Sequence, residues 1–526
     1  MMMTSAFEIL GPVMVGPSSS HTAGALRIAL VARELAPDPL KHVSFELFNS
    51  FSHTYRGHGT DRALVAGMLG LTPDDIRVRD SFALAEQQHL SFDFIERGDD
   101  PALHPNTVVI TMEGDGDTCV VTGESVGGGR VRLSKINGVS VEVRGDYPTV
   151  FIVHDDRAGV LAELTRVISG EGLNIATLSN YRERKGGKAY TIIESDEYIS
   201  PELIAHVRTL KHILFAASIE IPGASRQAPD TVLHNGFDCG EELLAATQSP
   251  ARRICDVMYA REVELMDEEA VRTSMRRVLE VMREETHAPL SDPEPSLGGL
   301  IGGQAQDVWQ AKDRLAACLM GSTLTRAVAY AMATLERSAT MGVMVAAPTA
   351  GSAGVVPGSI LAVGEALGAD DEALMDALWT AAAVGAIIAQ NASVSGAEGG
   401  CQAEVGSASA MAAAALVELL GGTPDQALDA ASIAIGNLLG LVCDPVRGLV
   451  EYPCQDRNAI GVANAISAAQ LSLSGVVNPL PFDQVVGALK SVGDSLPTAL
   501  RETAKGGLAK AASCSGCMRC SIQAGR

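Results

Sequence analysis

The segment Ser407-Ala-Ser-Ala-Met-Ala-Ala-Ala-Ala-Leu-Val-Glu-Leu-Leu420 consists almost entirely of small and aliphatic residues. It lies in a longer region, residues 320–481, whose only aromatic side chains are Tyr330, Trp379 and Tyr452. Small side chains let helices approach one another closely. From residue 233 onward the apolar residues repeat with a period near 3.6, apart from glycine-rich breaks. We therefore expect a large all-helical domain with a tightly packed core.

The first segment of the chain mixes helical and strand-like patterns. The helical stretches are residues 22–35 and 61–68, and the strand-like runs are residues 43–48, 107–112 and 138–143. This mixture predicts an α+β domain over residues 1–146.

The next segment alternates between strand and helix patterns in the order βαββαβ, which is typical of a ferredoxin-like unit. We expect this unit over residues 147–222. The stretch Pro222–Asp230 is rich in Pro, Ala and Ser and predicts a linker. The helical domain would then cover residues 223–526, so the chain is multidomain. The expected elements of the unit are residues 149–153, 160–168, 175–181, 189–193, 201–210 and 215–221.

Composition excludes several classes of protein. The 526 residues are 47% hydrophobic and 20% charged, which excludes a disordered chain and allows a sizeable core. The net charge of −23 argues against binding to nucleic acid or to an anionic membrane surface. The sequence shows no export signal and no run of about 20 apolar residues. We expect a cytoplasmic protein with reduced thiols, since ten cysteines are too few for a disulfide scaffold.

Three cysteines stand at Gly- or Pro-containing breaks of the helical region, where helix ends leave backbone donors free and leave room for a ligand. They are Cys401, Cys443 and Cys454. By spacing alone they could equally be structural, because no C-x-x-C pair brackets them. A second cluster, Cys514-Ser-Gly-Cys517-Met-Arg-Cys520, could bind zinc, donate one ligand to a cluster elsewhere, or form a redox-active tail.

Polar residues in glycine-marked loops are candidates for binding a substrate. The loop Ala347–Gly354 presents successive backbone N–H groups that suit an anion, although such loops also serve helix packing. Small polar side chains at residues 391–395 could orient a polar molecule or simply end a helix. The candidates are Thr349, Gly351, Ser352, Asn391 and Ser393.

Three histidines of the first segment lie in comparable polar loops. His21 occurs in Gly16–Gly24, His58 lies between two glycines, and His104 precedes a predicted strand. A lone histidine is usually structural, but imidazole is the common proton-transfer group near neutral pH. We therefore treat all three as catalytic candidates, with Ser18 and Ser20 beside His21 as possible substrate contacts. Pyridoxal phosphate is disfavoured, because residues 313–489 contain no lysine for a Schiff base.

The middle segment resembles an ACT domain, a small regulatory module that binds amino acids. The resemblance rests on Tyr147-Pro-Thr-Val-Phe-Ile-Val-His154, Asp156-Arg-Ala-Gly-Val-Leu161 and Gly172-Leu-Asn-Ile-Ala176. It implies a regulatory amino acid bound at Asp156, Gly159 and Asn174, where the helix N-terminus suits a carboxylate. The alternative is a unit that only mediates dimerisation.

The motifs together are similar to those of the bacterial iron–sulfur-dependent L-serine dehydratases. The carrying motifs are GPSSSHTAG (16–24), GHGTD (57–61), HPN (104–106), APTAGSAGVVPG (347–358), SGAEGGCQAEVG (395–406) and CDPVRGLVEYPC (443–454). Both halves match in order over essentially the whole chain. The sequence resembles a fusion of the two chains that some members of this family keep separate.

This resemblance implies a cofactor and a reaction. Cys401, Cys443 and Cys454 would hold a 4Fe–4S cluster whose fourth iron acts as a Lewis acid on L-serine. The products would be pyruvate and ammonia, formed through aminoacrylate. Cys514 would occupy the open iron until substrate displaces it, although Cys517 and Cys520 depart from the family pattern.

The same resemblance assigns roles to the polar loops. His58 would be the base, His21 and His104 would complete a polar rim, and the loop 348–354 would hold the substrate carboxylate. Two other functions stay open: an iron–sulfur hydro-lyase acting on a different hydroxy acid, and a non-catalytic amino-acid-responsive sensor. The protein is expected to form a homodimer or a larger homo-oligomer.

Overall fold

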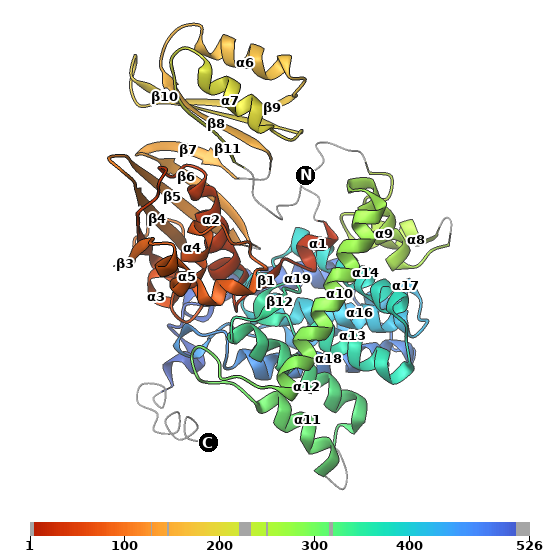
Figure 1. Ribbon diagram of the computed structural model, residues 1–526. Coiled ribbons are helices and arrows are strands. Elements are labelled where there is room, and N and C mark those ends of the chain that lie inside the picture. Colours follow the sequence, from red (N-terminus) through yellow and green to blue (C-terminus); the bar gives the residue numbers. More distant parts are fainter. Residues whose placement is uncertain are drawn as a thin grey trace.

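The computed structural model describes residues 5–127, 129–144, 147–219, 233–248, 251–314 and 319–511. Figure 1 shows a mixed sheet with helices, a smaller sheet stacked at its end, and a large helical part that contains the C-terminal half. This arrangement confirms the expected multidomain chain with a mixed N-terminal part and a helical C-terminal part. The predicted boundary residues 146, 222 and 223, and the predicted linker, lie outside the described residues.

The N-terminal part contains a six-stranded sheet in the order β3-β2-β4-β5-β6-β7, in which only the β2–β3 pair is parallel. Gly123 of β5 allows α2 to approach closely, since a Cβ there would lie 2.2 Å from Ile28 Cγ2. The predicted strands and helices are present, whereas β3, β5 and β6 were not predicted. The elements are α2 (Gly24–Arg33), β2 (His42–Phe48), α3 (Asn49–Thr54), α4 (Thr60–Met68), α5 (Ser81–Gln87), β3 (Ser91–Gly98), β4 (Asn106–Glu113), β5 (Thr118–Gly127), β6 (Arg130–Ile136) and β7 (Val139–Val143).

The smaller sheet has the predicted βαββαβ order of elements, with strands arranged β11-β8-β10-β9. Alternation along β8 separates its two faces: Val150 and Ile152 pack under the helices, whereas Phe151 joins the core of the N-terminal part. The helix-free face is therefore covered within the chain itself. The elements are β8 (Thr149–Asp155), α6 (Val160–Gly170), β9 (Ile175–Arg182), β10 (Lys188–Ser195), α7 (Pro201–Thr209) and β11 (Ile213–Ile219).

The helical part is organised around α16, the alanine-rich helix, which packs against α13, α14, α17 and α18. Six alanines of α16 are fully buried, namely Ala408, Ala410 and Ala412–Ala415. Because their side chains are small, the neighbouring helices can pack closely, and the predicted tight core is present. The helices are α8 (Gly240–Gln248), α9 (Ile254–Leu265), α10 (Glu268–Ser291), α11 (Gln304–Arg314), α12 (Gly321–Ala339), α13 (Val355–Leu367), α14 (Asp371–Asn391), α15 (Gly396–Gly399), α16 (Ser407–Leu419), α17 (Pro424–Leu438), α18 (Cys454–Leu473) and α19 (Phe482–Ser495).

An N-terminal arm, α1 (Ala6–Ile9) and β1 (Val13–Val15), joins the helical part. Ala6 and Ile9 lie in the helical core, and β1 pairs antiparallel with β12 (Val343–Val345). The expectation of a purely helical C-terminal domain is corrected by β12. A three-residue strand is too short to show a period of two, and its partner is more than 300 residues away.

Two carboxylates, the buried Glu418 and the half-buried Asp483, fix the starts of two helices of this part. Glu418 accepts hydrogen bonds from the backbone N–H groups of Ile254 (2.6 Å) and Cys255 (3.1 Å), at the beginning of α9. Asp483 does the same for Gly240 at the beginning of α8, at 2.6 Å. Each carboxylate satisfies N–H donors that a helix cannot satisfy itself and lies at the positive end of the helix dipole.

Two apolar helical stretches are long enough to cross a membrane by length and hydropathy, namely Ala350–Leu367 and Asp371–Asn391. Of these windows, 72% and 78% of the residues are buried inside the protein, as expected for core helices.

Candidate functional site

Three breaks between helices bring cysteines towards one place. Cys401 follows α15 and opens a π-helical turn, Gln402–Gly406, that continues into α16. Cys443 lies in the loop after α17, and Cys454 is the first residue of α18. All three thiols are buried and unpaired. Because π-helical turns often mark functional sites, the turn after Cys401 is informative in itself.

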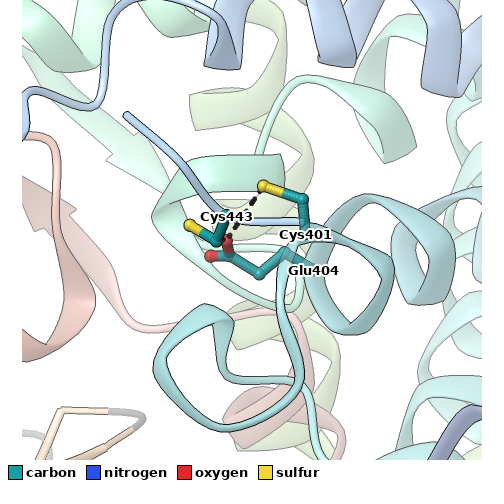
Figure 2. A group of neighbouring side chains, drawn as sticks. All are labelled: Cys401, Glu404 and Cys443. Carbon is teal, nitrogen blue, oxygen red and sulfur yellow. Dashed lines mark hydrogen bonds between the residues drawn. The ribbon is translucent and has the colours of Figure 1, made fainter. Parts of the chain in front are cut away.

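Glu404 joins Cys401 and Cys443, as Figure 2 shows. Its Oε2 atom lies 3.9 Å from each Sγ atom, and the three ligand atoms are all within 4.8 Å of one another. Gly396 makes room for this carboxylate, because a Cβ there would lie 2.4 Å from Oε2. The sequence reasoning missed Glu404. The signal was its i+3 spacing from Cys401, which places both on one helix face.

Cys454 lies outside that tight group, but it belongs to the same electrostatic environment. Burial, followed by the charges of Cys401 and Glu404, raises the pKa of Cys454 well above its usual range. The hydrogen-bonded Cys401 thiol, followed by burial, raises the pKa of Cys443 in the same way. Burial also raises the pKa of Glu404. The cluster therefore disfavours negative charge unless a cation is bound.

Arg457 supports the cysteine loops from the first turn of α18. Its guanidinium donates to Cys401 Sγ (3.4 Å), to the Val442 carbonyl (2.8 Å) and to Asp444 (2.7 Å). The Arg457–Asp444 pair is buried, so screening by solvent is weak. Such outer contacts orient metal ligands, and Arg457, three residues after Cys454, was also missed by sequence reasoning.

The donor set fits an iron–sulfur group. Three buried thiols, none in a disulfide, share one electrostatic environment with Arg457, which donates to Cys401 Sγ, and cysteine thiolates are the usual ligands of such clusters. The closest three donors are nevertheless two thiols and a carboxylate, which would also suit a single metal ion. Cys514, the predicted tail ligand, lies outside the described residues.

The loop after β12 lies against this cluster. Thr349 donates a hydrogen bond of 2.8 Å to Glu404 Oε1, and Ser352 lies 3.2 Å from the Thr349 hydroxyl. Gly351 is equally close, since a Cβ there would lie 2.9 Å from Glu404 Oε1. Asn458 fixes the loop by donating to the Gly351 carbonyl at 2.8 Å. The predicted substrate residues Thr349, Gly351 and Ser352 therefore lie close to the Glu404 carboxylate. The Thr349 hydroxyl already donates its hydrogen bond to that carboxylate.

His21 and His58 form a pair in the N-terminal part, with ring centroids 4.6 Å apart. His21 lies in a second π-helical turn, Ser19–Ala23, which Ser18 caps by accepting from the His21 N–H at 3.0 Å. The His21 ring contacts the hydroxyls of Ser20 and Ser50, each at 2.8 Å. Its position is therefore fixed from both sides, and burial, with a smaller effect of His58, lowers its pKa well below the usual range.

His58 has a different environment. Within the described part of the chain, neither ring nitrogen makes a hydrogen bond of normal geometry, and the side chain is 1% exposed. Burial lowers the pKa of His58 to about 4, although the nearby backbone of Gly448 opposes this shift. His58 is therefore a buried imidazole with a lowered pKa, and no side chain of the described residues engages its ring nitrogens. The hydroxyl of Thr60, likewise buried and without a partner in the described structure, is a polar group that sequence reasoning missed.

The histidine pair faces the cysteine loops across the interface of the two parts. Ser19 accepts a hydrogen bond of 3.2 Å from the N–H of Ala350, next to Thr349. Gly57 packs on Leu449 of the Cys443–Cys454 loop so closely that a Cβ would lie 2.2 Å from Leu449 Cδ2. Motifs more than 300 residues apart in sequence therefore meet at one interface.

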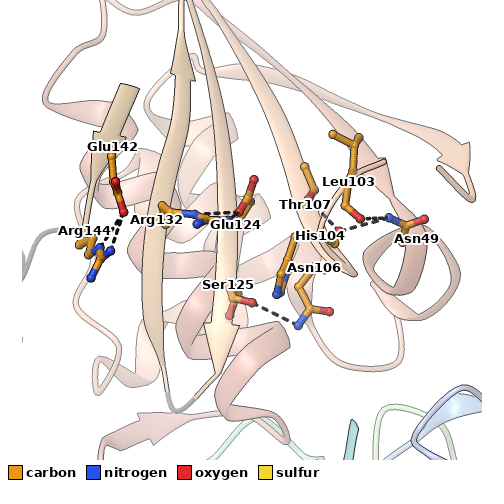
Figure 3. A network of polar contacts seen from close by, with 10 residues as sticks. All are labelled: Asn49, Leu103, His104, Asn106, Thr107, Glu124, Ser125, Arg132, Glu142 and Arg144. Atoms are coloured by element: carbon orange, nitrogen blue, oxygen red, sulfur yellow. Dashed lines mark hydrogen bonds and ion pairs between the residues drawn. The ribbon is translucent and has the colours of Figure 1, made fainter. Parts of the chain in front are cut away.

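His104 lies in a separate polar network at the edge of the sheet (Figure 3). Its Nδ1 accepts from the Asn106 N–H at 3.2 Å, and its carbonyl accepts from Asn49 and Thr107. Burial lowers the pKa of His104, while the charges of Glu124 and Glu398 oppose that shift. The charge of Glu398 acts on His104, and Glu398 belongs to α15, the short helix that precedes Cys401.

Two predicted substrate residues are engaged elsewhere. Asn391 donates to the Asp238 carbonyl at 2.7 Å and to its own helix, so it anchors the end of α14. Ser393 donates to Glu398 at 2.7 Å, so its hydroxyl is engaged by α15.

The predicted regulatory residues lie in the smaller sheet unit, but their contacts are separate. Gly159 has φ = 95° at the start of α6, and Asp156 accepts from the Gly186 N–H at 2.8 Å. The Asn174 side chain donates to Asp196 at 2.9 Å. The backbone turn is as expected, whereas no direct contact joins Asn174 to Asp156 in the described structure.

Comparison with known proteins agrees with this arrangement. The family model described as serine dehydratase alpha chain matches residues 211–509, and that described as serine dehydratase beta chain matches residues 5–135. The probable L-serine dehydratase alpha chain of Bacillus subtilis is 48% identical over 271 residues, which cover 51% of this chain and 90% of the relative. The L-serine dehydratase beta chain of Peptoniphilus asaccharolyticus is 38% identical over 218 residues, covering 41% and 98%.

A full-length relative shows the same two regions in one polypeptide. The L-serine dehydratase of Streptomyces coelicolor is 30% identical over 530 residues, which cover 97% of this chain and 99% of the relative. The alpha-chain match contains all three cysteine breaks, and the beta-chain match contains the three histidines. The chain belongs to the serine dehydratase family, with the alpha-chain and beta-chain regions fused.

Proposed function

We propose that this chain is an L-serine ammonia-lyase, which converts L-serine into pyruvate and ammonia. The observation that carries the proposal is the interface at which the buried imidazole of His58 lies near the backbone of Gly448, between Cys443 and Cys454, beside the contact of Gly57 with Leu449. Family membership and the names of the relatives support serine as the substrate. Elimination of water gives aminoacrylate, which tautomerises and hydrolyses to the two products.

We assign Cys401, Cys443 and Cys454 as the protein ligands of a 4Fe–4S cluster. When bound, the cluster would supply Lewis acidity to the departing hydroxyl group of the substrate. Arg457 would keep the Cys401 sulfur oriented, and the buried Arg457–Asp444 pair would hold the loops in place. Cys514 is the proposed tail ligand.

His58 would remove the Cα proton, because a buried imidazole that stays neutral can accept a proton at physiological pH. His21, held between Ser20 and Ser50, would orient it, and the buried hydroxyl of Thr60, two residues after His58, is a further polar group of this motif. His104 would line the opposite side of the rim. The loop of Thr349, Gly351 and Ser352 would shape the substrate site, with Ser18 and Ser20 contributing hydroxyls.

The direct test is anaerobic reconstitution with iron and sulfide, followed by a serine-dependent pyruvate assay. About four irons and four sulfides per chain with pyruvate release support the proposal. A single metal without sulfide would instead favour a mononuclear site at Cys401, Glu404 and Cys443. Activity on a hydroxy acid that lacks the amino group, or metal without turnover, would favour the hydro-lyase or the sensor. Exposure to air should inactivate the enzyme, and Fe²⁺ with a reductant should restore it.

The smaller sheet unit is proposed to act as an ACT-type regulatory domain that binds an amino acid, with L-serine as the first candidate. The βαββαβ order and the left-handed turn at Gly159 support this assignment. Gly159→Val would strain that turn, since its φ is 95°, and should abolish sigmoidal kinetics while iron content stays unchanged. Hyperbolic kinetics in the wild type would contradict regulation here.

We also propose that the protein forms a homodimer or a larger homo-oligomer in the cytoplasm. Sedimentation measures the size of the assembly.

A further inference from the structure

The Glu404 carboxylate has fewer strong donors than Glu418, the buried carboxylate farther along the same helical run. Its Oε1 atom accepts from the Thr349 hydroxyl at 2.8 Å. Its Oε2 atom has only the Cys401 and Cys443 thiols, each at 3.9 Å, as partners in the described structure. Thiols are weak donors, so Oε2 is poorly satisfied even before a metal binds.

Metal binding would remove both of these partners. A ligating cysteine is a thiolate and donates no hydrogen bond. Arg457, the nearest cation, directs its N–H groups to Cys401 Sγ, Val442 and Asp444. In the loaded protein Oε2 would then have no donor from the described residues, and a desolvated carboxylate oxygen without a donor is costly.

Glu404 nevertheless remains accessible to a small molecule. It is half-buried by surface area, and the bare backbones of Gly351 and Gly396 flank it. A Cβ at Gly396 would come within 2.4 Å of Oε2 and 3.3 Å of Cys443 Sγ, so the carboxylate can lie this close to the backbone only because this residue is glycine. A second carboxylate cannot be the ligand of Oε2, because like charges would repel.

We propose that Glu404 binds the α-ammonium group of the substrate and thereby selects an amino acid over a hydroxy acid without an amino group. This inference rests on the proposed function. An ammonium carries three N–H donors and a positive charge, which matches the donor that Oε2 lacks. Sites built to pair with a polar group reject analogues that lack it, because the partner in the site is then left unsatisfied.

Two other roles for Glu404 make different predictions. If Glu404 were a metal ligand, its replacement would lower the metal content. If it only held the Thr349 loop in place, its replacement would weaken every ligand of the pocket alike. A second carboxylate, Glu502, lies close enough for its charge to interact with that of Glu404, and its backbone N–H donates to the Cys443 carbonyl at 2.9 Å. Glu502→Gln is therefore the natural comparison variant.

The experiment compares Glu404→Gln, Glu502→Gln and wild-type holoenzyme, all reconstituted anaerobically. Glu284→Gln, in an exposed ion pair with Arg337, is the matched control. Iron and sulfide content and the visible spectrum report loading. The KM for L-serine and the Ki of 3-hydroxypropanoate, which is serine without its amino group, report selectivity. Thermal shifts of the holoenzyme with either compound give a readout independent of turnover.

Glu404→Gln is expected to keep its iron. Its affinity for L-serine should fall by about ten- to 150-fold, which corresponds to the loss of a hydrogen bond to a charged group. The affinity for 3-hydroxypropanoate should stay the same or improve. Equal weakening of both compounds, loss of iron, or a selectivity change only in Glu502→Gln would overturn the inference. A wild-type protein that binds no cluster and releases no pyruvate would overturn the proposed function itself, and the two failures are thus distinguishable.

Discussion

Glu404 and Glu418 stand near opposite ends of one continuous helical run, Cys401–Leu419, and their carboxylates have very different partners. Glu418 accepts two backbone N–H groups at 2.6 and 3.1 Å, together with the Thr380 hydroxyl. Glu404 has one hydroxyl donor and two thiols. Glu418 is buried and Glu404 half-buried, but the clearer difference between these two carboxylates is the number of strong donors that each one has.

The largest effect should come from the thiols beside Glu404. Cys443→Ala is expected to remove iron and activity together, because a cluster that loses one of three protein thiolates is not retained. The apoprotein should keep the thermal stability of wild-type apoprotein, since the site makes few strong contacts. Iron analysis and differential scanning calorimetry measure the two effects. Full iron content with normal turnover would show that Cys443 is not a ligand.

The next effect concerns His58, whose chain neighbour Gly57 packs on the loop between Cys443 and Cys454. His58→Ala should lower kcat by about 10²–10⁴-fold, the usual contribution of a positioned base, with iron still bound. His53→Ala, at an exposed ion pair with Asp99, is a suitable control. A loss below about tenfold, outside the range expected of a base, would move the role to another group.

The pH dependence provides a second check on His58. Because its pKa is lowered to about 4, kcat/KM should show no loss attributable to His58 between pH 8 and about 6, where an ordinary histidine would begin to protonate. The unfolded chain takes up a proton at His58 below about pH 6.5, and the folded chain does so only near pH 4. Stability from His58 is therefore lost as pH falls through this window, and His58→Ala should reduce that loss in denaturation curves.

At the other end of the helix the effect should appear in stability. Glu418→Leu leaves two buried N–H groups of α9 without acceptors and should cost about 2–6 kcal/mol, estimated from about 1–3 kcal/mol per unsatisfied group. Glu418→Gln keeps one oxygen and should cost less. Denaturant unfolding of the apoproteins checks both variants. If Glu418→Leu unfolds like wild type, the distinction between the two carboxylates fails.

The smallest effect concerns the single strong donor of Glu404. Thr349→Val removes that hydroxyl and should raise the KM for L-serine by about two- to tenfold, the value of an ordinary hydrogen bond. The kcat should hardly change, and Thr349→Ser should restore the KM. An unchanged KM in Thr349→Val would mean that Thr349 does not position Glu404.

Much of the fold could be predicted from local pattern. The helices of the C-terminal half and the βαββαβ unit have strong periodicity, and the structure contains both. β12 could not be predicted, because three residues show no periodicity and their partner lies in a distant arm. The strands β5 and β6 were missed because Gly123 and several charged residues interrupt the alternation of apolar and polar residues along them.

The candidate site residues that could be predicted from the sequence are those in loops rich in glycine. Such loops led to Cys401, Cys443 and His58, which the structure places at one interface between the two parts. Glu404 and Arg457 lie within helices that look like ordinary core or surface, and only their i+3 spacing from Cys401 and Cys454 hints at a shared face. The sequence could not separate Glu404 from Glu418, because the difference lies in partners that come from distant segments.

The N-terminal arm has a consequence for the order of events during synthesis. Val13 of β1 pairs with Val345, so about 330 further residues must leave the ribosome before its partner strand exists. At roughly 5–20 residues per second this delay is on the order of 20–60 s, during which the arm has an unpaired edge. Closure of this two-stranded sheet must come late, and it joins the part that carries the histidines to the part that carries the thiols. The nascent chain therefore cannot complete its site until long after the first motifs have been made.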